Sequence, residues 1–173
     1  MGKSVNLKLV KPSIKYKKAF LEMLKDHKKS SSALYIKESK MPFEKYIKDL
    51  DNQSKGINLK TGYVPATTYW LVKNNVIVGV ARLRHKLNDK LLKIGGHIGY
   101  DVPPSQRRKG YGTVLLKLTL QKAKEKGIKK ILVTCDKNNI ASAKIIQENG
   151  GILENEVFDR GLDKIKQRYW IKL

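Results

Sequence analysis

The stretch of the chain most suited to chemistry holds two glycines, Gly110 and Gly112, at the expected start of a helix. Three consecutive basic residues, Arg107, Arg108 and Lys109, come directly before them. Glycine lets the backbone adopt positive φ and approach a ligand closely, and the free N–H groups at a helix start bind phosphate. The basic side chains add positive charge beside those N–H groups. From the residues alone, the segment is interpreted as a pyrophosphate cradle, with a simple turn before an amphipathic helix as the alternative.

A dinucleotide-binding fingerprint is another way to use two glycines at a helix start. That fingerprint needs a third glycine, but Leu115 occupies the corresponding position. It also places its first glycine directly after a strand, whereas residues 103–109 intervene here. Asp136 stands where a ribose-binding acid would, but one acid does not make the motif. The residues therefore favour a phosphate cradle of another kind.

Hydropathy patterning predicts strands and helices on both sides of the glycines. Apolar runs predict strands at residues 5–10, 67–72, 76–87, 91–102, 131–135, 152–158 and 168–173. Helical spacing predicts helices at residues 14–27, 43–50, 113–126 and 141–147, and residues 52–61 are expected to form a loop. The order β-α-α-β-β-β-α-β-α-β-β predicts an α/β fold with a mixed sheet of about seven strands and about four helices.

Composition is typical of a soluble folded protein with one domain, expected to span residues 1–173. The 37 Lys and Arg against 15 Asp and Glu give a net charge of +22, and 40% hydrophobic residues suit a packed core. Cys135 is the single cysteine, so no intramolecular disulfide can form, and no signal-peptide pattern is present. A cytoplasmic protein is therefore expected. No apolar run approaches the ~20 residues that cross a bilayer, so no membrane association is expected.

The positive charge has two interpretations. Lysines occur in every segment with no block of five like charges, which favours a solvated basic surface. A field of this sign would still attract an anionic cofactor or a nucleic acid. A basic nucleic-acid-associated module therefore stays open as an alternative function.

A family resemblance rests on the sequence Arg-Arg-Lys-Gly-Tyr-Gly at residues 107–112. It matches the Arg/Gln-x-x-Gly-x-Gly/Ala signature of the GNAT superfamily of N-acetyltransferases. Residues 99–104 resemble the family's fourth strand and the following turn, residues 139–142 its second cofactor-contacting segment, and residues 149–151 its usual helix end. The resemblance covers residues 95–159 by motif and the rest of the chain by topology.

The resemblance implies a GNAT-like, mostly antiparallel sheet, an acetyl-CoA co-substrate and no metal. The family transfers an acetyl group directly to a primary amine of a small molecule or protein within a ternary complex. The implied acceptor is such an amine, and the implied assembly is a monomer or homodimer. The cofactor-binding roles carry over to Arg107, Arg108, Lys109, Gly110, Tyr111, Gly112 and Thr113 at the pyrophosphate, to Tyr100, Asp101 and Val102 along the pantetheine arm and thioester, and to Asn139 and Ser142 opposite them.

The chain departs from the family pattern at Ile146, where many members carry a tyrosine that acts as general acid. Ile146 is expected in the core, so solvent or another group would protonate the leaving thiolate. Tyr100 is a candidate proton donor, with a packed aromatic as its alternative. A non-catalytic acyl-CoA-binding member is therefore a further alternative for the whole chain.

Transfer to an amine requires a proton acceptor or a water chain, and the glycine-rich strand at residues 95–101 offers the first candidates. Strand alternation places His97, Gly99 and Asp101 on one face. His97 is the first candidate base because imidazole titrates near neutral pH, and a structurally hydrogen-bonded histidine is its alternative. Glu154 and Glu156 are further candidates.

Other titratable residues receive structural interpretations. His27 and His85 are expected at the surface, and Cys135 is expected to be a small core residue. In the family, acceptor specificity comes from the first helices with their loop and from the C-terminal hairpin, which correspond here to residues 30–62 and the region of Gly161.

Overall fold

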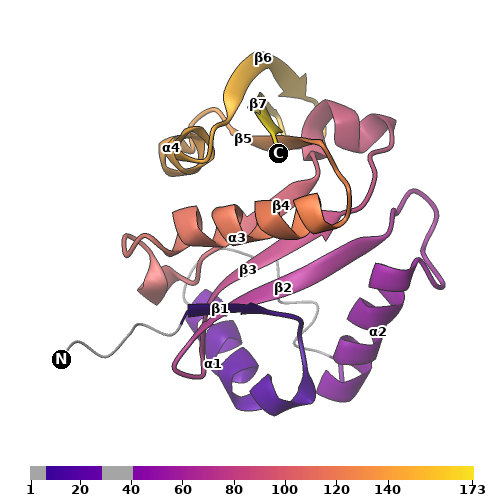
Figure 1. The fold of residues 1–173 in the computed structure, drawn as a ribbon, viewed down its shortest axis with the longest axis vertical. Helices are drawn as coiled ribbons and strands as arrows, with labels where there is room; N and C mark the ends of the chain where they lie inside the picture. Colours follow the sequence, from indigo (N-terminus) through magenta and orange to yellow (C-terminus); the bar gives the residue numbers. More distant parts are fainter. Residues whose placement is uncertain (1–6, 29–40) are drawn as a thin grey trace.

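The computed structural model describes residues 7–28 and 41–173 (Figure 1). Its strands are β1 (Leu7–Val10), β2 (Ala66–Lys73), β3 (Val76–Arg84), β4 (Ile98–Asp101), β5 (Lys130–Asp136), β6 (Ile152–Asp159) and β7 (Lys164–Lys172). Its α-helices are α1 (Lys17–Lys28), α2 (Phe43–Lys55), α3 (Tyr111–Glu125) and α4 (Ile140–Glu148). The order of strands and helices confirms the one predicted. Residues 5 and 6 of the first expected strand lie outside the described residues.

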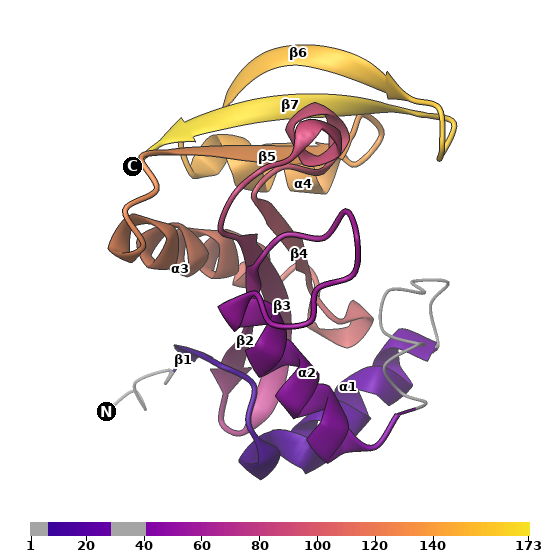
Figure 2. The same ribbon diagram turned by 90° about the vertical axis from the view of Figure 1, so that its right-hand side faces the viewer.

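All seven described strands form one sheet in the order β1-β2-β3-β4-β5-β7-β6. Neighbouring strands are antiparallel except β4 and β5, which are parallel. The sheet is therefore mixed and mostly antiparallel, as predicted. Figures 1 and 2 show β5, β7 and β6 at one end of the molecule and α1 with α2 toward the other.

The two faces of the sheet are covered by different helix pairs. On one face, the rings of Phe20 in α1 and Trp70 in β2 stack at 5.5 Å, within a cluster that also holds buried residues of α2. On the other face, Leu116 of α3 and Ile146 of α4 are fully buried against β5 and β7. Along β3, Val80 belongs to the first cluster and Ala81 contacts α3, so alternate residues face opposite helix pairs.

Helix α2 extends further than the sequence predicts. Residues 52–61 were expected to form a loop, yet α2 continues to its C-terminal end at Gly56, which has a φ of 75°. Lysine–aspartate pairs four residues apart stabilise its exposed side: Lys45 Nζ lies 2.6 Å from Asp49, and Lys55 lies 2.6 Å from Asp51. Polar residues therefore prolong a helix whose apolar stripe ends earlier.

The long strand predicted over residues 91–102 is wrong in its first half. Leu91–Gly95 is a π-helical turn, and β4 begins only after it. The side chain of Asn88 accepts a 3.0 Å hydrogen bond from the first N–H of the turn, and Gly96, with a φ of 66°, follows its last residue. The preceding strand also stops three residues early, at Arg84. Side-chain capping and a positive φ therefore outweigh the apolar pattern here.

The surface position predicted for His27 is wrong. Its exposed fraction is 1%, because it follows Leu24 by three residues and Phe20 by seven and so lies on the buried face of α1. His85 is partly buried, and its Nε2 lies 2.8 Å from the hydroxyl of Thr67. Across the described ranges, no helix has the length and apolar character of a membrane span.

Candidate active site

The strands β4 and β5 pair at one position and then diverge. The pair is Ile98 with Val133, and just before it the N–H of His97 donates to the carbonyl of Leu132 at 2.7 Å. A Cβ on Gly96 would lie 2.6 Å from that carbonyl oxygen, so glycine allows the two backbones to meet here. Beyond this contact both strands continue without pairing, and Figure 2 shows them separating. Diverging strands present their edges to a ligand.

The segment 107–113, called the cradle below, follows β4 and leads into α3. Arg108 has a φ of 60° and Gly110 a φ of 77°, so the backbone turns twice through the left-handed region before the helix begins at Tyr111. Within the described part of the chain, no N–H from Arg108 to Thr113 has a hydrogen-bond acceptor. The cradle therefore presents a run of free donors at the positive end of a fifteen-residue helix.

Side chains of the cradle mainly fix its shape. Arg107 Nε donates to the carbonyl of Val102 at 3.0 Å, and Lys109 Nζ donates to the carbonyl of Ser105 at 2.8 Å. The hydroxyl of Tyr111 points away and accepts a 3.0 Å hydrogen bond from Lys73 on β2. Basic side chains thus hold the loop, while the backbone amides of residues 108–113 have no acceptor among the described residues.

Gly112 also has a packing role, which the sequence did not predict. A Cβ there would lie 2.6 Å from Cδ1 of Ile145, so this glycine lets α3 and α4 pack closely. A Cβ built on Gly110 would have no described atom within 4 Å, so it is the positive φ at this position that favours glycine. The neighbouring Thr113 hydroxyl donates to Glu148 of α4 at 2.9 Å, a second contact between the two helices. Gly110 therefore supplies a left-handed turn of the cradle, while Gly112 contributes an N–H to the cradle and also lets the two helices pack.

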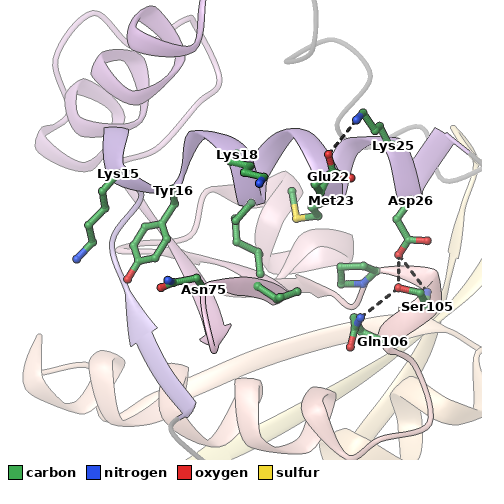
Figure 3. Close-up of a pocket in the computed structure, with 14 residues that line it drawn as sticks. Lys15, Tyr16, Lys18, Glu22, Met23, Lys25, Asp26, Asn75, Ser105 and Gln106 are labelled. Carbon is green, nitrogen blue, oxygen red and sulfur yellow. Dashed lines mark hydrogen bonds and ion pairs between the residues drawn. The ribbon is translucent and has the colours of Figure 1, made fainter.

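The loop before the cradle is anchored to α1. Asp26 accepts hydrogen bonds from the N–H of Ser105 at 3.0 Å and from its hydroxyl at 2.9 Å (Figure 3). Beside this contact is an open hollow of about 1020 Å³, which α1, Asn75 and residues 103–106 line. It contains none of the predicted site residues, and its acidic residues, Glu22 and Asp26, are both hydrogen-bonded. We therefore assign it no role in the site.

On the far side of the β4–β5 opening, Tyr100 contacts the start of α4. Its hydroxyl lies 2.7 Å from the hydroxyl of Ser142, whose N–H is capped by the side chain of Asn139 at 3.0 Å. Burial raises the pKa of Tyr100 to about 12 and, also by burial, the pKa of Cys135 to about 11. Both groups are therefore protonated at neutral pH. Tyr100 brings a donor to the opening, while Cys135 is 7% exposed, a core thiol as expected.

His97 lies at the point where β4 and β5 meet. Its Nδ1 accepts a 2.9 Å hydrogen bond from the N–H of Leu132, and burial, with the nearby charge of Arg84, lowers its pKa to about 4. A neutral imidazole that accepts at Nδ1 carries its proton on Nε2 and has no free lone pair. This geometry favours the structural alternative for His97 over the role of base.

Asp101 is the last residue of β4, and its carboxylate lies on the face of the sheet that α1 covers. Its side chain is 17% exposed, and its Oδ1 accepts the N–H of Val102 at 2.8 Å. Its Oδ2 lies 3.6 Å from Nδ1 of the buried His27, and Arg107 lies 3.7 Å from Oδ1. Sequence reasoning did not consider Asp101 as the base. Strand alternation, which places Asp101 on the same face as His97, could have indicated it.

The remaining candidates of the sequence lie elsewhere. Glu154 pairs with Arg168 at 2.7 Å and Glu156 with Lys137 at 2.8 Å, both on the outermost strand β6. Ile146 is fully buried, which confirms its place in the core. Of the region expected to select the acceptor, residues 30–40 lie outside the described residues. Among those described, no cluster of His, Cys, Asp and Glu could hold a metal ion.

Comparison with known families decides the identity of this arrangement. The model of the Acetyltransferase (GNAT) family matches residues 26–150, well over half of the chain. The chain belongs to the GNAT acetyltransferase family. The resemblance inferred from residues 107–112 is therefore confirmed.

Solved GNAT structures share the fold at low sequence identity. The microcin C7 self-immunity acetyltransferase MccE, in complex with acetyl-CoA and AMP, is 17% identical, with a TM-score of 0.68 over 96% of this chain and 92% of its own. The Salmonella typhimurium acetyltransferase that modifies the N-terminal serine of ribosomal protein L7/L12 is 17% identical, with a TM-score of 0.67 over 99% and 96%. The putative acetyltransferase yncA of Salmonella typhimurium, with acetyl-CoA, is 14% identical, with a TM-score of 0.64 over 96% and 94%. A comparison with curated proteins finds no match.

Proposed function

We propose that this GNAT protein transfers the acetyl group of acetyl-CoA directly to a primary amine of a small molecule or protein, in a ternary complex. The observation that carries the proposal is the run of N–H groups from Arg108 to Thr113, which have no acceptor among residues 7–28 and 41–173 and lie at the start of α3, after the strand that diverges from β5. A pyrophosphate fits such a run because each oxygen can accept several donors without a side chain in the way. The net charge of +22 also attracts a polyphosphate.

The proposed reaction forms an amide N–C bond and breaks the thioester C–S bond. We place the backbone of Tyr100, Asp101 and Val102 along the pantetheine arm and a backbone N–H of this strand at the thioester carbonyl, where it stabilises the developing negative charge. Asn139 and Ser142 lie opposite. The whole chain, residues 1–173, acts as one N-acetyltransferase domain in this proposal, and a cytoplasmic location stays a prediction.

Two protons have to move in this reaction. Asp101 accepts the proton that the attacking amine loses, since its carboxylate ends β4 beside the opening and is 17% exposed. Tyr100 donates a proton to the leaving thiolate from a hydroxyl that is neutral at pH 7. Solvent then restores both groups. The role of His97 as base stays a prediction of the sequence, and its hydrogen bond to Leu132 weighs against it.

Titration calorimetry with acetyl-CoA tests the proposal, using Gly110→Glu against the matched control Gly127→Glu. Both glycines have a φ of 77° and open space around them, so both variants carry the same strain and the same charge change. Only Gly110 is in the cradle. We expect micromolar binding for wild type and the control, and a loss of at least about 100-fold for Gly110→Glu, because a carboxylate replaces free space beside the phosphates.

The outcomes of this titration are distinct. Equal affinity in the two variants would remove the cradle from the binding site. Failure of folded wild type to bind millimolar acetyl-CoA would overturn the proposed function as a whole. Tight binding with no thiol release across a broad panel of amines would favour a non-catalytic acyl-CoA-binding protein.

A further inference from the structure

Arg82, near the C-terminal end of β3, has a guanidinium with no hydrogen-bond or ion-pair partner in the part of the chain that the structure describes. It is partly buried, its Nε is sealed from solvent, and none of its N–H groups has an acceptor among the described residues. A guanidinium carries five donors and a permanent charge, and such groups are normally paired when they leave water. Arg82 can therefore bind an anionic group of a ligand.

By contrast, Arg84, which lies on the same face of β3, has hydrogen-bond partners. Its Nη1 donates to the carbonyls of Gly95 at 3.1 Å and Gly96 at 3.0 Å, so it fixes the turn before β4. Burial first, and then the charge of Arg82, lowers the pKa of Arg84. The two cations thus repel each other, and a bound anion at Arg82 relieves that repulsion.

Arg82 lies in the wall of a hollow of about 430 Å³ between β3, α2 and the segment that follows α2. The other walls include the apolar side chains of Leu50, Ile57 and Tyr63, and Lys60 adds a second positive charge. The acidic lining residue, Asp49, is bound to Lys45 at 2.6 Å. A hollow of this size holds a small ligand, and its charge selects a negative group.

Gly99 lies between Arg82 and the end of β4 on one face of the sheet. Arg82 pairs with Gly99 of β4, and a Cβ built on Gly99 meets nothing described within 4 Å. Asp101, the proposed proton acceptor, lies two residues further along β4 and therefore on the same face. An acceptor can lie over Gly99 with its amine toward Asp101 and its other end toward Arg82.

We propose that the acceptor amine carries a carboxylate and that Arg82 binds this carboxylate. The planar guanidinium offers two parallel N–H donors, which matches the two oxygens of a carboxylate. The inference rests on the proposed acetyl transfer and names its acceptor class: a free amino acid or an acidic peptide, both of which present a carboxylate near a primary amine.

Pairs of amines that differ in the carboxylate test the inference. L-phenylalanine against phenethylamine tests a free amino acid, and the peptide Ser-Glu-Glu-amide against Ser-Gln-Gln-amide tests an acidic peptide. Thiol release measures turnover with acetyl-CoA. We expect kcat/KM about 10- to 100-fold higher for the carboxylated member of at least one pair, mainly through KM, as for one charged hydrogen-bonded contact. The pair that shows the preference identifies the source of the carboxylate.

Three variants connect that preference with the residue. Arg82→Gln should abolish it and leave turnover of the amines without a carboxylate unchanged. Arg82→Lys should keep part of it, because charge remains while bidentate geometry is lost. Lys124→Gln removes one positive charge from the exposed end of α3 and should change nothing. Calorimetry with acetyl-CoA verifies that each variant is folded and binds its donor.

Each result separates this inference from the proposed function. Equal kcat/KM within both pairs, or a preference that survives Arg82→Gln, overturns the inference and leaves acetyl transfer standing. If no amine is acetylated although acetyl-CoA binds, the proposed function fails. Calorimetry of the same amines against CoA-loaded protein then decides the site: carboxylate-dependent binding that Arg82→Gln removes supports it, and absence of such binding overturns it.

Discussion

The cradle and the acceptor face, meaning the side of the sheet that holds Arg82, Gly99 and Asp101, use different parts of the polypeptide. In the cradle, the backbone amides of residues 108–113 have no acceptor among the described residues, and the side chains of Arg107 and Lys109 hold the loop. On the acceptor face the backbone is paired in the sheet and the side chains supply charge. Backbone amides can bind an acetyl donor that is the same throughout a family. Side chains, which vary with the sequence, can select an acetyl acceptor that differs between members.

The largest expected effect is on the acceptor face. Asp101→Asn should lower kcat about 100- to 1,000-fold, because the amide cannot accept the amine proton. The Kd for acetyl-CoA should change less than about threefold, since the backbone of β4 is untouched. Thiol release with the amine that wild type acetylates fastest measures kcat, and titration calorimetry measures the Kd. A kcat within fivefold of wild type would remove Asp101 from the mechanism.

The stability of the protein is expected to depend on the protonation of His97, which lies where β4 meets β5. The pKa of His97 falls to about 4 in the folded protein, against an ordinary value of 6.5, so the unfolded chain binds more protons between these values. Stability is therefore full above pH 6.5 and declines as pH falls toward 4, by no more than about 3 kcal/mol.

Urea unfolding of wild type and His97→Gln at pH 7 and pH 4.5 measures this linkage. The variant should be less stable at pH 7 but lose less stability on acidification, because it lacks the His97 imidazole while the other titratable groups are the same in both proteins. An identical pH dependence would show that His97 is not linked to folding, and would restore its candidacy as an accessible base.

The packing beneath the cradle gives the next effect. Gly112→Ala should destabilise the protein by about 1–3 kcal/mol, since the new Cβ would lie 2.6 Å from Cδ1 of Ile145. The double variant with Ile145→Val lacks that methyl group and should regain most of the loss. Urea unfolding of the three proteins measures it. Equal stability of the single and double variants would contradict the assigned contact.

The smallest effect is expected for a cradle side chain. Lys109→Gln should weaken acetyl-CoA binding less than about fivefold, because Lys109 is exposed and its Nζ bonds the carbonyl of Ser105. Calorimetry at 50 and 200 mM salt separates its charge from its structural contact. A loss comparable with that of Gly110→Glu would show that side chains, not amides, bind the phosphates.

Local patterns predicted most of the fold. The order of strands and helices followed from hydropathy, because each amphipathic run has to bury one face wherever the chain goes. Errors occurred where local chemistry competed with that pattern: Asn88 and Gly96 replaced half a strand with a turn, and lysine–aspartate pairs prolonged α2. His27 was misplaced because its residue type was weighed above its position on the helix.

The sequence by itself determined the cradle, because its donors and its left-handed turns all lie within seven consecutive residues. Only the tertiary structure decided the acceptor face. Arg82, Gly99 and Asp101 come together through strand register, and whether an arginine such as Arg82 or Arg84 has a carbonyl to bind depends on where a distant turn folds. Contacts between residues far apart in the chain leave no trace in local spacing, so the partner of a charged side chain is known only once the strands are paired.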